Sequence, residues 1–236
     1  MNSNINNNNI NFGTNIKFIS PNDFNKVKKS FMFKHSCPAT YNYNLDMVNQ
    51  GKKCYRVGKE KNYTQGIKNC TGLVVADAQK YLNCFFAHFF PSPKNYNRLQ
   101  IIEPYLKGTN AVLVGSKSTC SFSDKMYEEI KNICKRKNMS ITGFKDFNQE
   151  WEADIAYEAK KDNLYICLKQ ILFKKDDISN YVDSMNKLKL FCNEITISDK
   201  DNIEFIKDGN LQVETWLDWT ISKTSFLLGK LLNLIN

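Results

Sequence analysis

The chain has 236 residues, 42% of them hydrophobic and 13% aromatic, which is enough to bury a substantial core without disulfides or metals. Its net charge of +9 is scattered and mostly Lys, which is typical first of a solvated surface and second of an acidic partner, with nucleic acid least favoured. The start is polar and no run of about 18 apolar residues occurs, so neither a secretory signal nor a transmembrane segment is expected.

Two N-terminal regions differ in character. Residues 1–15 are rich in Asn and low in complexity, and such a segment buries too little apolar surface to order itself. We therefore expect a disordered leader there. Residues 16–62 have a mixed composition, and the apolar stretch Phe31–Phe33 predicts an extension that packs on the core.

A strand-rich core is expected over residues 63–170. Its first two strands are the apolar runs Leu73–Ala76 and Leu82–Phe90, which a loop of hairpin length at Asp77–Tyr81 connects. The second run is expected to end at Pro91, because residues that precede proline avoid the helical conformation. The two strands are therefore predicted to pair as a hairpin.

Two helices are predicted in the rest of the core. One covers Asn95–Lys107, although Pro104 disturbs its last turn. The other covers Asp124–Lys137, with Ser123 as its N-cap. The apolar stripe of this second helix consists of Met126, Ile130, Ile133 and Cys134.

Four further short strands complete the predicted core. They are Ala111–Gly115, Ile141–Phe147, Ala153–Glu158 and Leu164–Leu168. The expected fold class is α/β in the broad sense (α+β): a layered, strand-rich core with two main helices.

Residues 171–236 are predicted to form a mainly helical C-terminal extension, with one helix near Ile178–Phe191. The spacing of apolar residues within 211–235 predicts an amphipathic helix or helical pair that includes Trp216 and Trp219. Three roles remain open for this helix: it docks on the core, binds a partner, or lies on a membrane surface.

Cysteine and histidine usage limits the chemistry of the chain. The eight cysteines occupy positions 37, 54, 70, 84, 120, 134, 167 and 192, and none forms a Cys-x-x-Cys pair. Only two histidines occur, His35 and His88, so we predict no metal site and no cofactor. Cys84, Cys134 and Cys167 lie in apolar segments and are expected to be free buried thiols, which fits action in a reducing cytosol.

Cys70 and His88 are the best candidates for a reactive pair. Cys70 lies in a polar turn just before the first strand, and His88 lies near the end of the second. In the predicted hairpin these two positions come together. An imidazole beside a thiol promotes formation of the thiolate, which attacks a carboxamide carbon while backbone N–H groups around Cys70 and Thr71 stabilise the oxyanion.

A third group is expected to orient the imidazole. Thr64 and Asp77 are the candidates nearest in sequence. A second pair, His35 and Cys37, lies in surroundings without a catalytic motif. A papain-like arrangement is disfavoured, because there the histidine follows the cysteine by more than about 100 residues.

Residues 63–168 resemble the CheD family, the chemoreceptor glutamine deamidases of bacterial chemotaxis, and the similarly built cytotoxic necrotizing factors. Thr64 precedes Cys70 by six residues, as in that family, and His88 opens the stretch His-Phe-Phe-Pro. An apolar strand that ends in small residues before a helix matches Ala111–Ser118.

The resemblance implies a Cys70–His88–Thr64 triad. It also implies an oxyanion and substrate turn built from Asn69 and Thr71, together with the turn at Gly115 and Ser116. Two departures occur in these turns. The family's Gly-Ser-Cys is Lys68-Asn69-Cys70 here, and its Gly-Gly is Gly115-Ser116.

The function that these features imply is protein-glutamine deamidation through a thioester. The same pair also suits a transglutaminase or an isopeptide or amide hydrolase, and an inactive protein-binding module is the non-enzymatic alternative. The extensions beyond the CheD-like core, the Lys surplus and the Asn-rich leader suit a bacterial virulence effector that modifies a host protein in the host cytosol.

Overall fold

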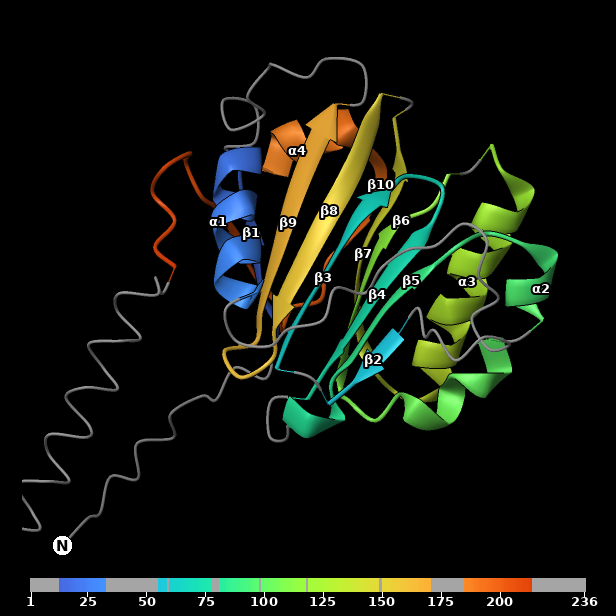
Figure 1. Ribbon diagram of the computed structural model, residues 1–236. Coiled ribbons are helices and arrows are strands. Elements are labelled where there is room, and N and C mark those ends of the chain that lie inside the picture. Colours follow the sequence, from blue (N-terminus) through green and yellow to red (C-terminus); the bar gives the residue numbers. More distant parts are fainter. Residues whose placement is uncertain are drawn as a thin grey trace, which may run out of the picture.

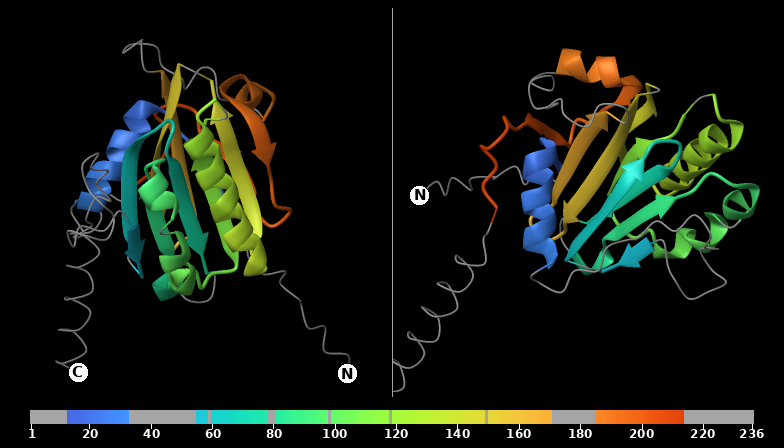
Figure 2. Two further views of the ribbon diagram at one scale, coloured as in Figure 1. Left: turned by 90° about the vertical axis from the view of Figure 1, so that its right-hand side faces the viewer. Right: turned by 45° about the horizontal axis from the view of Figure 1, so that its top comes forward.

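The computed structural model describes residues 13–32, 55–58, 60–77, 81–97, 99–117, 119–148, 150–170 and 185–213. Two mixed β-sheets stack face to face, and helices cover their outer faces, so that the chain forms four layers (Figure 1). Helix α1 (Pro21–Met32) covers one sheet and helix α3 (Ser121–Arg136) covers the other. Figure 2 shows α3 lying across the second sheet. The molecule therefore belongs to the predicted broad class.

Sheet A has five strands. In spatial order they are β11 (Asn202–Phe205), β1 (Asn15–Phe18), β9 (Asn163–Gln170), β8 (Trp151–Glu158) and β3 (Lys61–Ile67). β1 runs parallel to both of its neighbours, whereas β9, β8 and β3 pair antiparallel. β3 is thus an edge strand of this sheet.

Sheet B has six strands. In spatial order they are β10 (Cys192–Thr196), β7 (Ser140–Phe147), β6 (Asn110–Gly115), β4 (Thr71–Ala76), β5 (Phe85–Phe89) and β2 (Tyr55–Val57). β6 and β7 are parallel and α3 connects them, whereas the other pairs are antiparallel. β4 therefore lies inside the sheet, between β5 and β6.

Three apolar clusters hold the layers together. The inner cluster fills the space between the two sheets and includes Ile155 of sheet A and Val114 of sheet B. A second cluster joins sheet B to α3 through Met126, Ile130, Ile133 and Cys134, the predicted stripe. A third joins sheet A to α1. Because each cluster excludes water from one interface, burial is the main stabilising term of the fold.

Most of the predicted core strands are confirmed with small changes at their ends. β4, β6, β7, β8 and β9 begin one or two residues before the predicted positions. β5 is shorter than predicted, because Tyr81–Asn83 form a 3₁₀ turn ahead of it. The hairpin of β4 and β5 is confirmed by their antiparallel pairing.

The predicted helix over Asn95–Lys107 is wrong. The segment contains a single helical turn α2 (Pro93–Tyr96) and two 3₁₀ turns, η2 (Leu99–Ile101) and η3 (Glu103–Tyr105). Proline has no N–H to donate and clashes with the preceding turn, so Pro104 starts a new turn instead of continuing a helix. The apolar residues that suggested the helix, Leu99, Ile102 and Leu106, are still buried.

Ser123 is not the N-cap of α3. The helix begins at Ser121, and the cap position is Cys120, whose side chain makes no capping hydrogen bond. The Ser123 hydroxyl instead bonds to two other turns, as described below. Good capping residues near a helix start do not fix the boundary, because other backbone groups compete for their hydroxyls.

Both extensions contribute strands to the sheets. Residues 13–15 of the predicted leader are ordered, since Thr14 is buried and β1 begins at Asn15. In the C-terminal extension only α4 (Met185–Phe191) falls within the predicted helix, and the strands β10 and β11 were not predicted. β10 and β11 are short edge strands whose exposed residues include charges, so they lack the apolar pattern of a core strand.

Several predictions concern residues outside the described ranges. They are residues 1–12 of the leader, the pair His35 and Cys37, and most of the predicted helix within 211–235, including Trp216 and Trp219. Within the described ranges, no helix has the length and apolar character needed to cross a membrane.

A buried ion pair provides a test of how sheet A is stabilised. Lys61 Nζ and Glu158 Oε1 lie 3.3 Å apart, and their side chains are only 5% and 7% exposed. Glu158→Gln is expected to destabilise the fold by about 3–5 kcal/mol, because it leaves the Lys61 ammonium buried with a neutral partner. Chemical denaturation measures the change.

The matched control is the exposed pair of Lys160 and Glu60, which are 2.8 Å apart with 50% and 38% exposure. Glu60→Gln is expected to change stability by less than about 1 kcal/mol. If Glu60→Gln and Glu158→Gln lower the free energy of unfolding equally, burial does not determine how much these ion pairs contribute to stability.

Candidate active site

The hairpin brings the two predicted catalytic positions to the same end of sheet B. Thr71 pairs with Phe89, and Gly72 pairs with His88. Cys70 directly precedes the first paired residue of β4. Cys70 and His88 therefore lie at the same end of two neighbouring strands, offset by two residues.

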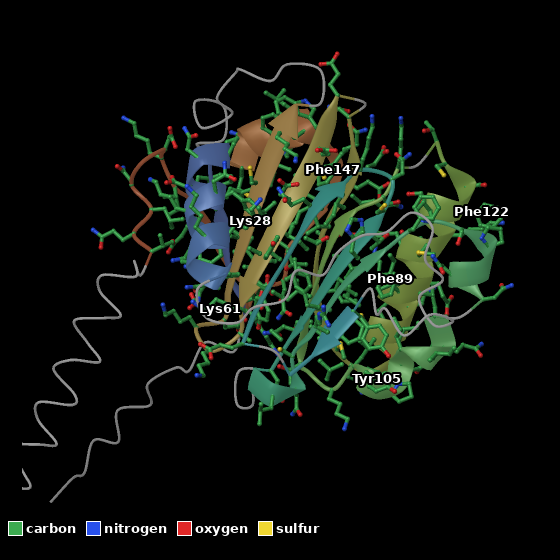
Figure 3. All side chains as sticks on the ribbon, in the orientation of Figure 1. Lys28, Lys61, Phe89, Tyr105, Phe122 and Phe147 are labelled. Atoms are coloured by element: carbon green, nitrogen blue, oxygen red, sulfur yellow. The ribbon has the colours of Figure 1, made fainter. Side chains whose placement is uncertain are left out.

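Their side chains lie on the same face of the sheet. Cys70 and Phe86 both belong to the inner cluster, and His88 follows Phe86 by two residues, so strand alternation places His88 on the inner face. Phe89, which Figure 3 labels on the side of α3, belongs to the opposite face. Since Gly72 is opposite His88, Cys70 is the diagonal neighbour of His88, at a typical Cβ separation of about 7 Å.

Gly72 lies between these two side chains, and a Cβ atom there would require two isoleucine side chains to shift. A Cβ atom at this position would lie 2.6 Å from Ile67 Cδ1 and 2.9 Å from Ile155 Cδ1, both on sheet A. The missing side chain allows the two sheets to approach each other beside Cys70. On the same inner face, a group of sheet A lies within hydrogen-bonding distance of His88.

Thr64 makes this contact from the edge strand β3. Its Oγ1 lies 2.7 Å from His88 Nδ1, and the two residues are only 2% and 1% exposed. The hydrogen bond crosses the space between the sheets. This hydrogen bond engages Nδ1 with sheet A. Proton exchange between His88 and a second group would therefore use the other ring nitrogen, Nε2.

Burial also fixes the charge of the histidine. Desolvation lowers the pKa of His88 from 6.5 to about 4, so the imidazole is neutral at pH 7. A neutral imidazole is able to accept a proton. The sequence predicts that the imidazole promotes formation of a Cys70 thiolate. A neutral His88 instead leaves the proton on the Cys70 sulfur until the sulfur attacks a substrate.

Asp77, the other predicted orienting residue, lies at the opposite end of β4. It follows Ala76, about 16 Å along the strand from Gly72. Its Oδ2 accepts a hydrogen bond of 2.8 Å from Asn83 Nδ2, within the far turn of the hairpin. Asp77 is therefore excluded as a partner of His88.

Gly115 and Ser116 hold the backbone of Cys70. The Ser116 N–H donates to the Cys70 carbonyl at 2.8 Å, so it is not available to an oxyanion. Both residues have positive φ angles, of 109° and 73°. A Cβ at Gly115 would lie 2.3 Å from the Cys70 oxygen, so this turn requires glycine for close backbone approach.

Ser123 joins the same turns and was missed as a site residue. Its Oγ accepts from the Lys117 N–H at 2.8 Å, donates to the Asn69 carbonyl at 2.5 Å and lies 3.2 Å from Ser116 Oγ. The start of α3 therefore fixes the peptide that precedes Cys70. Nothing in the local sequence indicates this, because Asn69 lies 54 residues away.

The remaining two turn residues differ in position. Asn69 is exposed at the tip of the β3–β4 connection. Thr71 is buried on the opposite face from Cys70, as alternation requires, and its Oγ1 has no hydrogen-bond partner among the described residues. Only the backbone of Thr71, and not its hydroxyl, is therefore next to Cys70.

The surroundings of Cys70 are buried and largely apolar. Cys70 is 5% exposed, and the inner cluster around it contains Ile67 and Val114. Cys84 belongs to the same cluster and is 1% exposed.

Across the described residues, no group of three or more His, Cys, Asp or Glu side chains is arranged to hold a metal ion. A comparison of the chain with protein-family models and with curated proteins finds no match.

Proposed function

We propose that the chain is a cysteine-dependent amidohydrolase that converts a glutamine side chain of a partner protein to glutamate. The observation that carries the proposal is the hydrogen bond of 2.7 Å between Thr64 Oγ1 and His88 Nδ1, on the inner face that Cys70 shares. Burying polar groups in an apolar cluster costs free energy, so a polar contact between the two sheets is expected to serve a function. Orienting the His88 imidazole beside the Cys70 thiol is such a function.

In the proposed reaction, Nε2 of His88 takes the proton of Cys70 as sulfur attacks the carboxamide carbon. The C–N bond then breaks, and the imidazolium gives its proton to the departing ammonia. Water attacks the thioester, which releases glutamate and restores the thiol. Thr64 holds Nδ1 throughout, and backbone N–H groups beside Cys70 stabilise the oxyanion.

The burial of the site favours a side-chain amide over a main-chain amide. A peptide bond continues in both directions, so a main chain reaches only a sulfur that lies in an open groove. A glutamine side chain is slim and ends in its amide, which suits a thiol that is 5% exposed. This supports a deamidase over a peptidase with the same residues.

The similarity to CheD and the cytotoxic necrotizing factors supports the same reaction. In this proposal the layered core is CheD-like, and the substrate is a protein that the basic surface recognises, with a host protein as the target of a secreted bacterial effector. Transglutamination by the same thioester requires an amine to replace water. An inactive binding module would retain the fold and lack turnover.

The test is a comparison of peptide masses in a cell lysate after incubation with the protein or with Cys70→Ala. Each deamidated glutamine gains about one dalton, because NH₂ is replaced by OH in the acyl transfer. We expect such peptides only with the unaltered protein. Amine-adduct masses would instead indicate transglutamination, and identical spectra for the two proteins would contradict enzymatic activity.

A further inference from the structure

A β-bulge in β3 determines which face Thr64 presents. Thr64 pairs with Ile155 and Ile67 pairs with Ala153, so two residues, Gln65 and Gly66, oppose the single residue Asp154. Thr64 and Ile67 are three positions apart and would face opposite sides in a regular strand. The bulge directs both of them to the inner face, where Ile67 joins the inner cluster.

Asp154 binds the bulge from the outer face of sheet A. Its Oδ1 accepts the Gly66 N–H at 2.8 Å, and its Oδ2 accepts the Gln65 Nε2 amide at 2.9 Å. The residue is 3% exposed, and Lys169 Nζ lies 2.9 Å from Oδ2 as its counter-charge. A buried carboxylate thus satisfies the backbone donor that the bulge exposes.

The backbone at the bulge depends on these contacts. Gly66 has a φ of 76°, the left-handed region that glycine adopts at little cost. Space is not the constraint, because a Cβ there would meet only Glu152 Oε2, at 4.0 Å. Backbone conformation and the bond to Asp154 together hold Gly66 in place.

We propose that Asp154 is a positioning residue for the candidate site: it fixes the Gln65–Gly66 bulge, which holds Thr64 against His88 Nδ1. The inference rests on the proposed function, since Thr64 matters to activity only if His88 is the base for Cys70. A network on the outer face of sheet A thereby controls the geometry between the sheets. Asp154 touches neither substrate nor the reacting atoms.

The experiment measures alkylation of Cys70 by iodoacetamide as a function of pH, by peptide mass, in the full chain. Thr64→Val removes the hydroxyl and serves as the reference. Asp154→Asn and Gly66→Ala disturb the bulge through different atoms, and Gly66→Asn tolerates the left-handed conformation. Each variant's fold is checked by circular dichroism.

Two matched controls separate positioning from general destabilisation. Glu152→Gln removes the other carboxylate that binds Lys169, at 3.0 Å, whereas the bulge itself is bound by Asp154. Gly209→Ala introduces the same backbone strain at a glycine with a φ of 80°, where an added Cβ would have no neighbouring atom within 4 Å. Both controls are expected to alkylate Cys70 within about twofold of the wild-type rate, since neither group touches the catalytic residues.

We expect Asp154→Asn and Gly66→Ala to slow alkylation about 10-fold or more and to shift its pH profile as Thr64→Val does, since small misplacements cost up to about 100-fold. Gly66→Asn should retain the wild-type rate. Asp154→Asn added to Thr64→Val should cause no further loss, because both act through one contact.

Wild-type rates in Asp154→Asn and Gly66→Ala, or additive losses in the double variant, would overturn the inference while the proposed function stands. If Thr64→Val and His88→Asn also leave the Cys70 rate unchanged, the proposed function itself fails. If Asp154→Asn does not fold, the comparison of Gly66→Ala with Gly66→Asn still decides between these outcomes.

Discussion

Cys70→Ala is expected to abolish hydrolysis of the glutamine side chain, with a loss of at least about 10³-fold in kcat. Cys70 is the proposed nucleophile that forms the thioester. The methyl group of alanine cannot replace its thiol in covalent catalysis. Ammonia release from a substrate protein found in the lysate experiment measures the loss.

The matched control is Cys84→Ala. Cys84 belongs to the same apolar cluster and is 1% exposed, so both substitutions remove one sulfur from the same interior. We expect similar losses of stability and an effect on turnover from Cys70→Ala alone. Loss of turnover in both variants would point to packing of the inner cluster and not to a nucleophile.

His88→Asn is expected to slow attack by Cys70 by about 10²- to 10⁴-fold at pH 7, the usual contribution of a general base. Asparagine has a similar polar reach and no basic nitrogen. The rate of iodoacetamide alkylation at Cys70 measures the effect without requiring a known substrate. An unchanged rate would show that His88 does not take the Cys70 proton.

The pH profile gives a sharper form of this prediction. Burial lowers the pKa of His88 to about 4, so wild-type alkylation should remain level from about pH 7 to 5 and fall below about pH 4. In His88→Asn the rate should instead rise about tenfold per pH unit up to the ordinary thiol pKa of about 8.5. Matching profiles in the two proteins would contradict the role of the histidine.

The same residue links stability to pH. Because the pKa of His88 is lower in the folded chain than its ordinary value of 6.5, the unfolded state binds more protons between about pH 4 and 6.5. Stability is therefore fully present above pH 6.5 and falls as the pH decreases through this window, by up to about 3 kcal/mol. His88→Asn should remove this slope in chemical denaturation experiments.

The elements next to the site were predictable because their patterns are local. Apolar runs on both sides of a short connection, and Pro91 after the second, predict the β4–β5 hairpin and the proximity of Cys70 and His88. Thr64 was selected from the resemblance to CheD. Its contact with His88 crosses two sheets, and how two sheets stack depends on the packing of many distant residues.

The supporting residues were not predictable for the same reason. Asp154 binds Gly66 over 88 positions of sequence, and Ser123 binds Asn69 over 54. A lone aspartate in a strand and a serine near a helix start have many ordinary explanations. The edge strands β10 and β11 were missed because exposed strands carry charges and do not alternate as core strands do.

The most direct test of the central claim is the order in which the cysteines of the native wild-type chain react with iodoacetamide near pH 6. By accessibility, Cys120 should react before Cys70, because it is partly exposed and Cys70 is only 5% exposed. A base at His88 reverses this order, so we expect Cys70 to be modified first among the cysteines that the structure describes. If Cys70 reacts no faster than Cys120, the proposed Cys70–His88–Thr64 triad is contradicted.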